Sequence, residues 1–239
     1  MTWLAFDTAT DRASVALAVD GGEVLEGELH GARRHAGGLV PLVQRLLARA
    51  SIGLADVRGL LLSDGPGSFT GLRVGASVAK ALAHARGLEI AVAPSLMVRA
   101  ASQAAGGATV LAVSNALRGE VYAASYRFAP GRVETLLAPS VWKPEALTRS
   151  APRPCTVVGD APPDAVALLA SWSGRAVVGP PMGWPRAALL FDLRQREGGA
   201  APIADVEHWE PDYGRPAEAQ ARWEQAHGRP LPDPARDTR

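Results

Sequence analysis

Short apolar runs separated by turn-forming residues open the chain. The runs at residues 3–6, 14–19 and 23–29 predict three β-strands, because each is short and bounded by residues that favour turns. Between the second and third runs, the Asp-Gly-Gly sequence at 20–22 is a strong hairpin signal. The pattern therefore predicts that the chain begins with an antiparallel meander of three strands.

The apolar period then changes to that of a helix. Residues 35–50 repeat apolar side chains at steps of three and four, which predicts a helix, although Pro41 inside the pattern favours a later start. A near-continuous apolar run at 57–63 predicts a strand buried on both faces of a sheet. The glycine-rich loop 65–71 then leads into a second predicted helix at 72–85.

A third helix is predicted after a short strand at 90–93. Ser95 is placed to cap this helix, which is expected to run to about residue 105 before Gly106 and Gly107 end it. Beyond the two glycines the signals of the second half follow one another in this order: strands at 109–114, 120–128 and 133–137, a strand at 156–159, a helix at 164–170, a strand at 175–179, a helix from Pro185 to about 197, and a tail helix at 217–226.

The strand pattern after the glycines repeats the opening meander. Asp7 and Asn115 hold matching positions after the first strand of each meander, although the two halves share little sequence identity. A duplicated meander followed by helices predicts an α/β fold built from two similar halves, residues 1–106 and 107–215. Residues 216–239 form a charged tail, part of which is expected to pack back on the first half.

Composition restricts the function classes. The chain has 239 residues, 47% hydrophobic residues and a formal net charge of +1, which favours neither a nucleic-acid binder nor a membrane-surface binder. Its single cysteine, Cys155, cannot form an intrachain disulfide and fits a reducing compartment. Because it lacks a signal-peptide pattern and any run of about 18 apolar residues, we expect a cytoplasmic protein with no membrane segment.

The first candidate for chemistry is the turn Asp7-Thr8-Ala9-Thr10. In kinases of the actin/sugar-kinase type, the corresponding hairpin uses a glycine to let backbone N–H groups approach phosphates, and a carboxylate to help hold a metal ion. Here the glycine position is Ala9, and the second half supplies Asn115, which is neutral and cannot act as a general base. The residues Asp7, Thr8, Thr10 and Asn115 therefore predict a degenerate nucleotide cleft, and the simpler interpretation that Asp7 and Thr10 only satisfy turn backbone groups stays open.

The glycine-rich segment 65–75 is a second candidate. It lacks the spacing of a phosphate-binding Walker loop, so we interpret it as a tight turn with Ser68 or Thr70 as the helix cap. Gly71, Gly75 and Ala79 recur every four residues and give one face of the following helix almost no side-chain bulk. Such a face lets another backbone approach closely, and the partner is either an internal element or another subunit.

No metal or cofactor site is predicted. The five histidines contain no His-x-x-x-His or His-Glu-x-x-His spacing, and no Gly-x-Ser-x-Gly nucleophile pattern occurs. The sequence therefore predicts neither a helical metal site nor a hydrolase nucleophile, and no catalytic residue is assigned.

Several of these segments together resemble the TsaB (YeaZ) family over about residues 3–230. The most distinctive is the glycine-rich block, and the others support it. They are Leu4-Ala5-Phe6-Asp7-Thr8-Ala9-Thr10, Gly65-Pro66-Gly67-Ser68-Phe69-Thr70-Gly71-Leu72-Arg73-Val74-Gly75, Pro94-Ser95-Leu96, Gly119-Glu120-Val121-Tyr122 and Glu210-Pro211-Asp212-Tyr213-Gly214-Arg215.

The resemblance implies a two-domain fold of the actin/sugar-kinase (ASKHA) superfamily, with a duplicated mixed β-sheet and flanking helices. It implies a non-catalytic accessory subunit that pairs with its paralogue TsaD, the metal-dependent catalytic subunit, and with the ATPase TsaE. Their reaction transfers a threonylcarbamoyl group to the adenosine following the anticodon of certain tRNAs. We expect little direct tRNA contact, because the net charge is only +1.

The resemblance also maps the dimer contact to the two early helices, and we expect self-association through them when the partner is absent. One departure from the family is Asn115, where an aspartate is usual. The implied interface residues are Leu39, Val43, Leu46, Leu47, Gly71, Val74, Gly75, Val78, Ala79 and Leu82.

Three alternatives stay open. The chain could be an active small-molecule phosphotransferase of the same superfamily, against which Ala9 and Asn115 argue. It could be a peptidase, for which the sequence supplies neither a metal pair nor a nucleophile motif, or a purely homodimeric scaffold.

Overall fold

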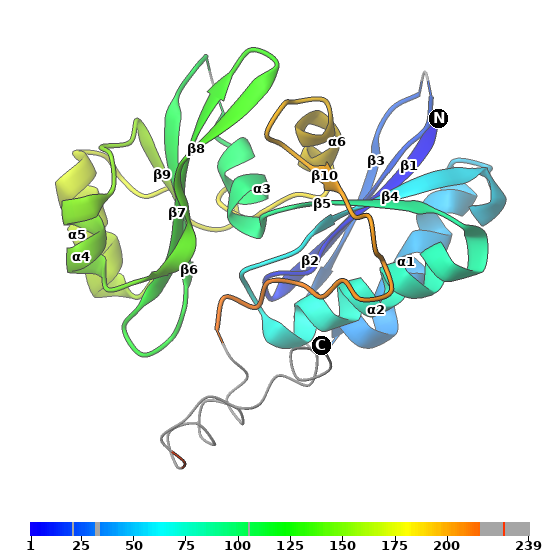
Figure 1. Ribbon diagram of the computed structural model, residues 1–239, viewed down its shortest axis with the longest axis horizontal. Helices are drawn as coiled ribbons and strands as arrows, with labels where there is room; N and C mark the ends of the chain where they lie inside the picture. Colours follow the sequence, from blue (N-terminus) through cyan, green and yellow to red (C-terminus); the bar gives the residue numbers. More distant parts are fainter. Residues whose placement is uncertain (21, 32–33, 105, 216–226, 228–239) are drawn as a thin grey trace, which may run out of the picture.

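Five layers make up the computed structural model, which describes residues 1–20, 22–31, 34–104, 106–215 and 227. Two helices cover the outer face of the first sheet and two others cover the outer face of the second (Figure 1). The helices α3 (Ser95–Ala101) and α6 (Leu189–Arg194) lie between the two sheets. The predicted α/β fold with two sheets and flanking helices is confirmed.

The first sheet has the strand order β10-β5-β4-β1-β2-β3. Its antiparallel part is the predicted meander of β1 (Thr2–Asp7), β2 (Arg12–Ala18) and β3 (Leu25–His30). The strands β4 (Val57–Ser63) and β5 (Glu89–Ala93) add to β1 in parallel. Parallel strands are covered on both faces, which is why the central runs are almost continuously apolar.

Helices α1 (His35–Arg49) and α2 (Phe69–Arg86) pack on one face of this sheet. Pro41 lies inside α1 and not at its start. The carbonyl that Pro41 leaves without a donor belongs to Gly37, which is exposed, so water can satisfy it. The short 3-10 helix η2 (Leu54–Asp56) connects α1 to β4.

The second sheet repeats this topology. Its order is β8-β7-β6-β9, which reproduces β3-β2-β1-β4 of the first sheet. The strands are β6 (Thr109–Asn115), β7 (Val121–Ala129), β8 (Arg132–Trp142) and β9 (Thr156–Gly159), and the outer helices are α4 (Pro144–Ser150) and α5 (Pro163–Ser173). The repeat predicted from the strand pattern is therefore present in three dimensions.

The last part of the described chain returns to the first half. Helix α6 contacts β4 and β5, and strand β10 (Ala201–Pro202) pairs with β5. The predicted extent of the second half, residues 107–215, is therefore too long, because it includes this returning segment. The predicted tail at 216–239 and its helix at 217–226 lie outside the described residues, apart from residue 227.

Two predicted elements are shorter in the structure. The strand expected at 175–179 is reduced to a single bridge between Val158 and Val178. The helix expected from Pro185 to 197 is only α6, Leu189–Arg194. Just before it, the Ala187 and Ala188 N–H groups donate to the Ser14 hydroxyl and the Glu26 carboxylate of the first sheet. The first N–H groups of a helix need such partners outside it.

Three hydrophobic clusters follow the layers. One lies between the first sheet and helices α1 and α2, and another between the second sheet and helices α4 and α5. The central cluster joins both halves through α3, α6 and the facing sheets. Among the described residues, no helix combines the length and apolarity needed to cross a bilayer.

Candidate functional site

The turn after β1 is enclosed by the glycine-rich loop. The N–H of Ser68 donates to the Ala9 carbonyl oxygen at 2.7 Å, and the Ala9 N–H donates to Asp7 Oδ1 at 3.3 Å. A side chain at Gly67 or Gly71 would overlap the Ala9 or Thr8 carbonyl oxygen, and a Cβ at Gly75 would lie 2.5 Å from Thr8 Oγ1. The Ala9 N–H is thus bonded within the turn, and the glycine-rich loop packs directly on the Thr8–Ala9 backbone.

This packing identifies the element that the small-residue face of α2 accommodates. Gly71 and Gly75 lie against Thr8, and Ala79 is fully buried in the first half's core. The sequence left open whether this face packs against an internal element or another subunit. For these residues it packs against an internal element, the turn after β1. Of the two predicted caps, Ser68 is the N-cap of α2, with its hydroxyl accepting from the Gly71 N–H at 3.3 Å, whereas Thr70 lies inside the helix.

Asp7 is completely buried at the end of β1. Burial raises the pKa of its carboxyl group, while the Ser63 hydroxyl, the Ala9 amide and the guanidinium groups of Arg99 and Arg12 oppose the shift. Thr8 is also buried, and Thr10 forms only local bonds, its hydroxyl donating to the Arg12 carbonyl at 2.8 Å. This arrangement matches the simpler interpretation for Thr10, which satisfies turn backbone groups.

Asn115 stands at the corresponding edge of the second sheet. Its side-chain oxygen accepts from the Leu117 N–H at 2.8 Å, and its own N–H donates to Asp160 at 3.4 Å. The structure thus confirms that Asn115 is the positional counterpart of Asp7. The two side chains do not meet; Arg99 lies between the two strand ends.

Arg99 of α3 connects the two halves. It is 2% exposed, donates to the Val113 carbonyl oxygen at 2.6 Å, forms an ion pair with Asp160 and stabilises the ionised form of Asp7. The sequence analysis did not single out Arg99, Asp160 or Asp64. A usable signal existed for both carboxylates, because each follows an apolar strand directly, as Asp7 does.

The predicted capping role of Ser95 is incorrect. Pro94 is the N-cap of α3, and the Ser95 hydroxyl instead accepts from the Gly65 N–H at 2.8 Å. The helix also ends at Ala101 and not near residue 105. A proline cap leaves the Ser95 side chain available to hold the glycine-rich loop.

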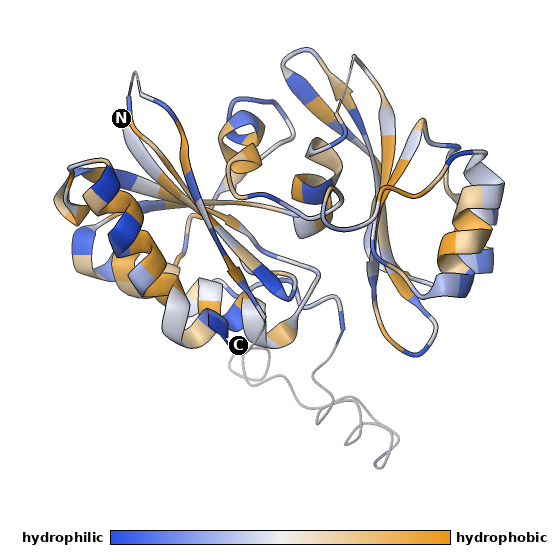
Figure 2. Cartoon of the chain, turned by 180° about the vertical axis from the view of Figure 1, so that it is seen from behind, coloured by the Kyte–Doolittle hydropathy of each residue, from blue (hydrophilic) through white to orange (hydrophobic). Residues whose placement is uncertain are grey.

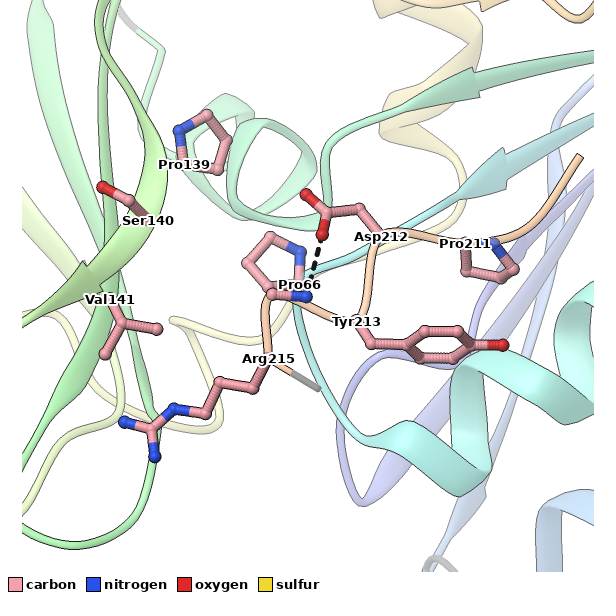
Figure 3. Close-up of a pocket in the computed structure, with 9 residues that line it drawn as sticks. Pro66, Pro139, Ser140, Val141, Pro211, Asp212, Tyr213 and Arg215 are labelled. Carbon is pink, nitrogen blue, oxygen red and sulfur yellow. Dashed lines mark hydrogen bonds between the residues drawn. The ribbon is translucent and has the colours of Figure 1, made fainter. Parts of the chain in front are cut away.

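A strap from residue 207 to 215 crosses from the first half to the second. The Asp212 N–H donates to the Asp64 carbonyl at 2.7 Å, the Tyr122 hydroxyl donates to the Tyr213 carbonyl at 3.3 Å, and Arg215 pairs with Glu120. Tyr213 points over α2 while Arg215 reaches toward the second half (Figure 3). The strap borders a hollow of about 520 Å³ between the halves.

The carboxylate of Asp64 lies close to that of Asp212 in the strap. Burial and the nearby Asp212 raise the pKa of Asp64 from 3.8 to about 6. Because the folded pKa exceeds the ordinary value, the contribution of Asp64 to stability is fully present below about pH 4 and is lost as the pH rises through about 6. Among the described residues, no group of three or more acidic, histidine or cysteine side chains has metal-binding geometry.

We expect Asp64→Asn to stabilise the fold at pH 7.5 and to have almost no effect at pH 4. The amide removes a buried charge that repels Asp212, and at pH 4 the wild-type carboxyl is already protonated. Thermal melts between pH 4 and 8 measure the difference. Glu207→Gln, at an exposed position on the same strap, is the control and should show no such pH dependence; a constant Tm difference for Asp64→Asn would contradict the argument.

A second hollow lies on the outer surface of the first half. It has a volume of about 440 Å³, and it is lined by Ala36, Phe69, Thr70, Arg73, Val74, Ser77 and Val78. Helices α1 and α2 run side by side there, on the side of the first sheet away from the second half (Figure 2). Phe69 is 40% and the neighbouring Val40 of α1 is 43% exposed, which are large values for apolar side chains.

The predicted partner interface stays a prediction, and its ten residues differ in exposure. Seven of them are buried within the chain, where their contacts hold α1 and α2 on the sheet. They are Leu39, Val43, Leu46, Leu47, Gly71, Gly75 and Ala79. Val74, Val78 and Leu82 are partly exposed.

Comparison with known proteins agrees with this architecture. The family model described as TsaD, tRNA N6-adenosine threonylcarbamoyltransferase, matches residues 30–158, more than half of the chain. The Escherichia coli K12 protein named tRNA threonylcarbamoyladenosine biosynthesis protein TsaB is 40% identical over 129 residues, which cover 53% of this chain and 55% of that protein. The Bacillus subtilis 168 protein of the same name is 28% identical over 93% of this chain and 98% of its own length.

The chain belongs to the TsaB (YeaZ) family. YeaZ of Pseudomonas aeruginosa has a solved structure that is 28% identical, with a TM-score of 0.67 over 81% of this chain and 91% of that one. A second Pseudomonas aeruginosa structure, described as similar to peptidase YEAZ, is 27% identical, with a TM-score of 0.73 over 90% of this chain and 99% of that one.

The TsaB relationship is uneven along the chain. Alignments with the Escherichia coli and Haemophilus influenzae TsaB proteins span only about half the length of those relatives. The matched family segment, 30–158, includes both α1 and α2 as well as the glycine-rich loop. The outer groove therefore lies within the segment that the TsaD family model matches, whereas the Thr8–Ala9 turn lies before that segment.

Proposed function

We propose that this TsaB family member is a non-catalytic accessory subunit that binds a TsaD-like catalytic subunit through the α1–α2 groove. The complex would transfer the threonylcarbamoyl group to the adenosine that follows the anticodon in tRNA. The observation that carries the proposal is the partly exposed apolar groove around Val74 and Val78.

The enclosed turn argues against phosphoryl transfer by this chain. Such catalysis depends on positioned donors and cations around the transferred phosphate. In this chain the Ala9 carbonyl and N–H are occupied by Ser68 and Asp7, and Asn115 brings no charge to the opposite edge. An active phosphotransferase would need the glycine-rich loop to withdraw from the Thr8–Ala9 turn.

The groove supports a protein partner. Exposed apolar side chains that gather in one hollow are typical of interaction sites. A groove between two helices can also receive the side chains of a helix from a partner. In our proposal the TsaE-like ATPase joins the larger complex, tRNA contact falls mainly to the catalytic subunit, and the chain works in the cytoplasm. Without the catalytic subunit, the same groove would support a homodimer.

Val74→Arg is expected to abolish binding to the TsaD-like subunit of the same organism. The arginine would place a charge in the apolar groove, where it has no partner on this chain's own helices. Isothermal titration calorimetry with the two purified proteins measures the loss, which we expect to exceed a hundredfold in Kd. Reconstituted tRNA modification should fall in parallel.

Ala167→Arg is the matched control. Ala167 is an exposed alanine on α5 of the second half, so the same charged side chain is introduced on a helix far from the groove. Equal weakening by both variants, or undiminished binding of Val74→Arg, would remove the groove from the proposal. Steady ATP or substrate turnover by the isolated chain would instead favour the phosphotransferase alternative.

A further inference from the structure

The side chain of Tyr213, in the strap, stacks on the rim of the α1–α2 groove. Its ring centre lies 4.6 Å from that of Phe69, the first residue of α2, and the ring planes are inclined by 45°. Tilted aromatic pairs at this separation attract one another beyond the surface that they bury. The Arg73 guanidinium lies 5.1 Å from the centre of the same Phe69 ring. Phe69 is still 40% exposed and lines the groove, so the stack holds the ring without covering it.

Tyr213 is held in turn by the neighbouring part of the strap. Its hydroxyl donates to Glu210 Oε2 at 3.1 Å, and Glu210 Oε1 accepts from Lys80 Nζ of α2 at 3.3 Å. Lys80 also donates to the Glu207 carbonyl oxygen at 3.1 Å. The strap thus lies along α2 from Lys80 to Phe69, and its contacts with this helix set where the Tyr213 ring stands (Figure 1).

The backbone of the same segment is attached to the second half. The Tyr122 hydroxyl of β7 donates to the Tyr213 carbonyl oxygen at 3.3 Å, and Arg215 pairs with Glu120. A Cβ added at Gly214 would lie 2.6 Å from the Tyr122 ring, so the strap and β7 are in close contact there. Tyr213 therefore joins two parts of the molecule, because its side chain points over α2 while its carbonyl group binds the second sheet (Figure 3).

We propose that Tyr213 is a positioning residue of the docking groove, and that the strap makes partner binding depend on how the second half is placed. The inference rests on the proposed function and adds a means of regulating the same site. An exposed aromatic side chain on the first turn of a helix has several rotamers open to it, and a partner that docks against it must immobilise it at an entropic cost. The stack of Tyr213 on Phe69 removes part of that cost beforehand. A shift of the second half that moves the strap would restore it.

The contact is measured first in the isolated chain. The sequence has four phenylalanines, so ring-labelled phenylalanine gives few NMR signals, and Phe69→Leu assigns those of Phe69. Tyr213→Leu should shift the Phe69 signals, whereas Tyr213→Phe, which keeps the ring, should leave them almost unchanged. Tyr122→Phe removes only the hydroxyl that binds the strap, and it should shift them in the same direction as Tyr213→Leu by a smaller amount. Phe69 signals that do not respond to Tyr122→Phe would overturn the link to the second half.

Partner binding tests the positioning role. Tyr213→Leu should raise the Kd for the TsaD-like subunit about fivefold, the size expected for the loss of one aromatic pair, whereas Tyr213→Phe should bind as the wild type does. In a chain that already carries Phe69→Leu, Tyr213→Leu should have no further effect on Kd. If Tyr213→Leu weakens binding equally with and without Phe69, Tyr213 contacts the partner itself and the positioning role is wrong.

Trp184→Leu is the matched control. Trp184 is another partly exposed aromatic residue that joins the chain beyond α5 to the first half, and it stacks on His30 and Arg12 of the opening meander. Its loss should change neither the Phe69 signals nor Kd, and thermal melts of each variant exclude unfolding as the cause of weaker binding.

The two proposals fail in different ways. If Val74→Arg abolishes binding while Tyr213→Leu leaves Kd unchanged, the positioning role is wrong and the proposed function stands. If the wild-type chain does not bind the TsaD-like subunit at all, the proposed function fails and the positioning role fails with it.

Discussion

Gly71→Ala is expected to destabilise the fold by about 3 kcal/mol, because its methyl group would overlap the carbonyl oxygen of Thr8. The obstacle is backbone at the end of a central strand, so it cannot move aside as a flexible side chain would. In a domain of this size such a loss lowers Tm by about 6–12 °C. Urea unfolding followed by circular dichroism measures the free energy directly.

Gly37→Ala is the matched control for this substitution. Gly37 lies in α1 with open space around the position that a Cβ would take, so alanine there should stabilise the helix by up to about 1 kcal/mol. If the two glycine-to-alanine changes alter the unfolding free energy in opposite directions, the effect of close packing is distinguished from that of helix propensity. Equal stability of wild type and Gly71→Ala would mean that α2 does not pack tightly on the Thr8–Ala9 turn.

Arg99→Met is expected to cost about 3 kcal/mol of unfolding free energy, because it removes one partner of a buried charge network. The guanidinium is the shared partner of the Val113 carbonyl and Asp160, and it stabilises ionised Asp7. Without it, the raised pKa of Asp7 should rise further. The loss should therefore grow as the pH rises, because Arg99 stabilises only the ionised form of Asp7.

Arg127→Met provides the comparison for Arg99. Arg127 pairs with Glu134 at 3.1 Å on the surface, where both side chains are more than 40% exposed, so its loss should cost less than about 1 kcal/mol. Urea unfolding at pH 4 and pH 8 gives the loss of unfolding free energy for each of the two variants at each pH. A cost for Arg99→Met that matches that of Arg127→Met at both pH values would mean that Arg99 does not join the two halves energetically.

Local patterns in the sequence were sufficient for much of the fold. Apolar period, turn residues and the placement of polar residues were enough to predict four features. These are the meander β1–β3, the buried strand β4, a helix cap at Ser68 or Thr70, and the repeat after Gly107. These signals act over a few residues, because a short strand or helix is specified largely by residues that are close to each other in the sequence. The family relationship also rested on contiguous motifs, above all the glycine-rich block.

The candidate site depended on contacts between distant residues. Arg99 reaches Asp160, Asp212 reaches Asp64, and α6 returns to the first sheet, in each case across many residues of chain. Nothing in a local pattern records such a pairing, because its energy arises only when the halves are packed together.

Which residues of α1 and α2 remain available to a partner was also decided by the tertiary structure. Apolar period marked both helices correctly, yet it gave the same signal for Leu39 and Val74. The sheet covers the first and leaves the second partly exposed. The sequence by itself thus determined the elements and the family. Packing alone decided which apolar side chains stabilise this chain and which stay exposed for a partner chain. The reason is that burial depends on what the folded chain brings against each helix.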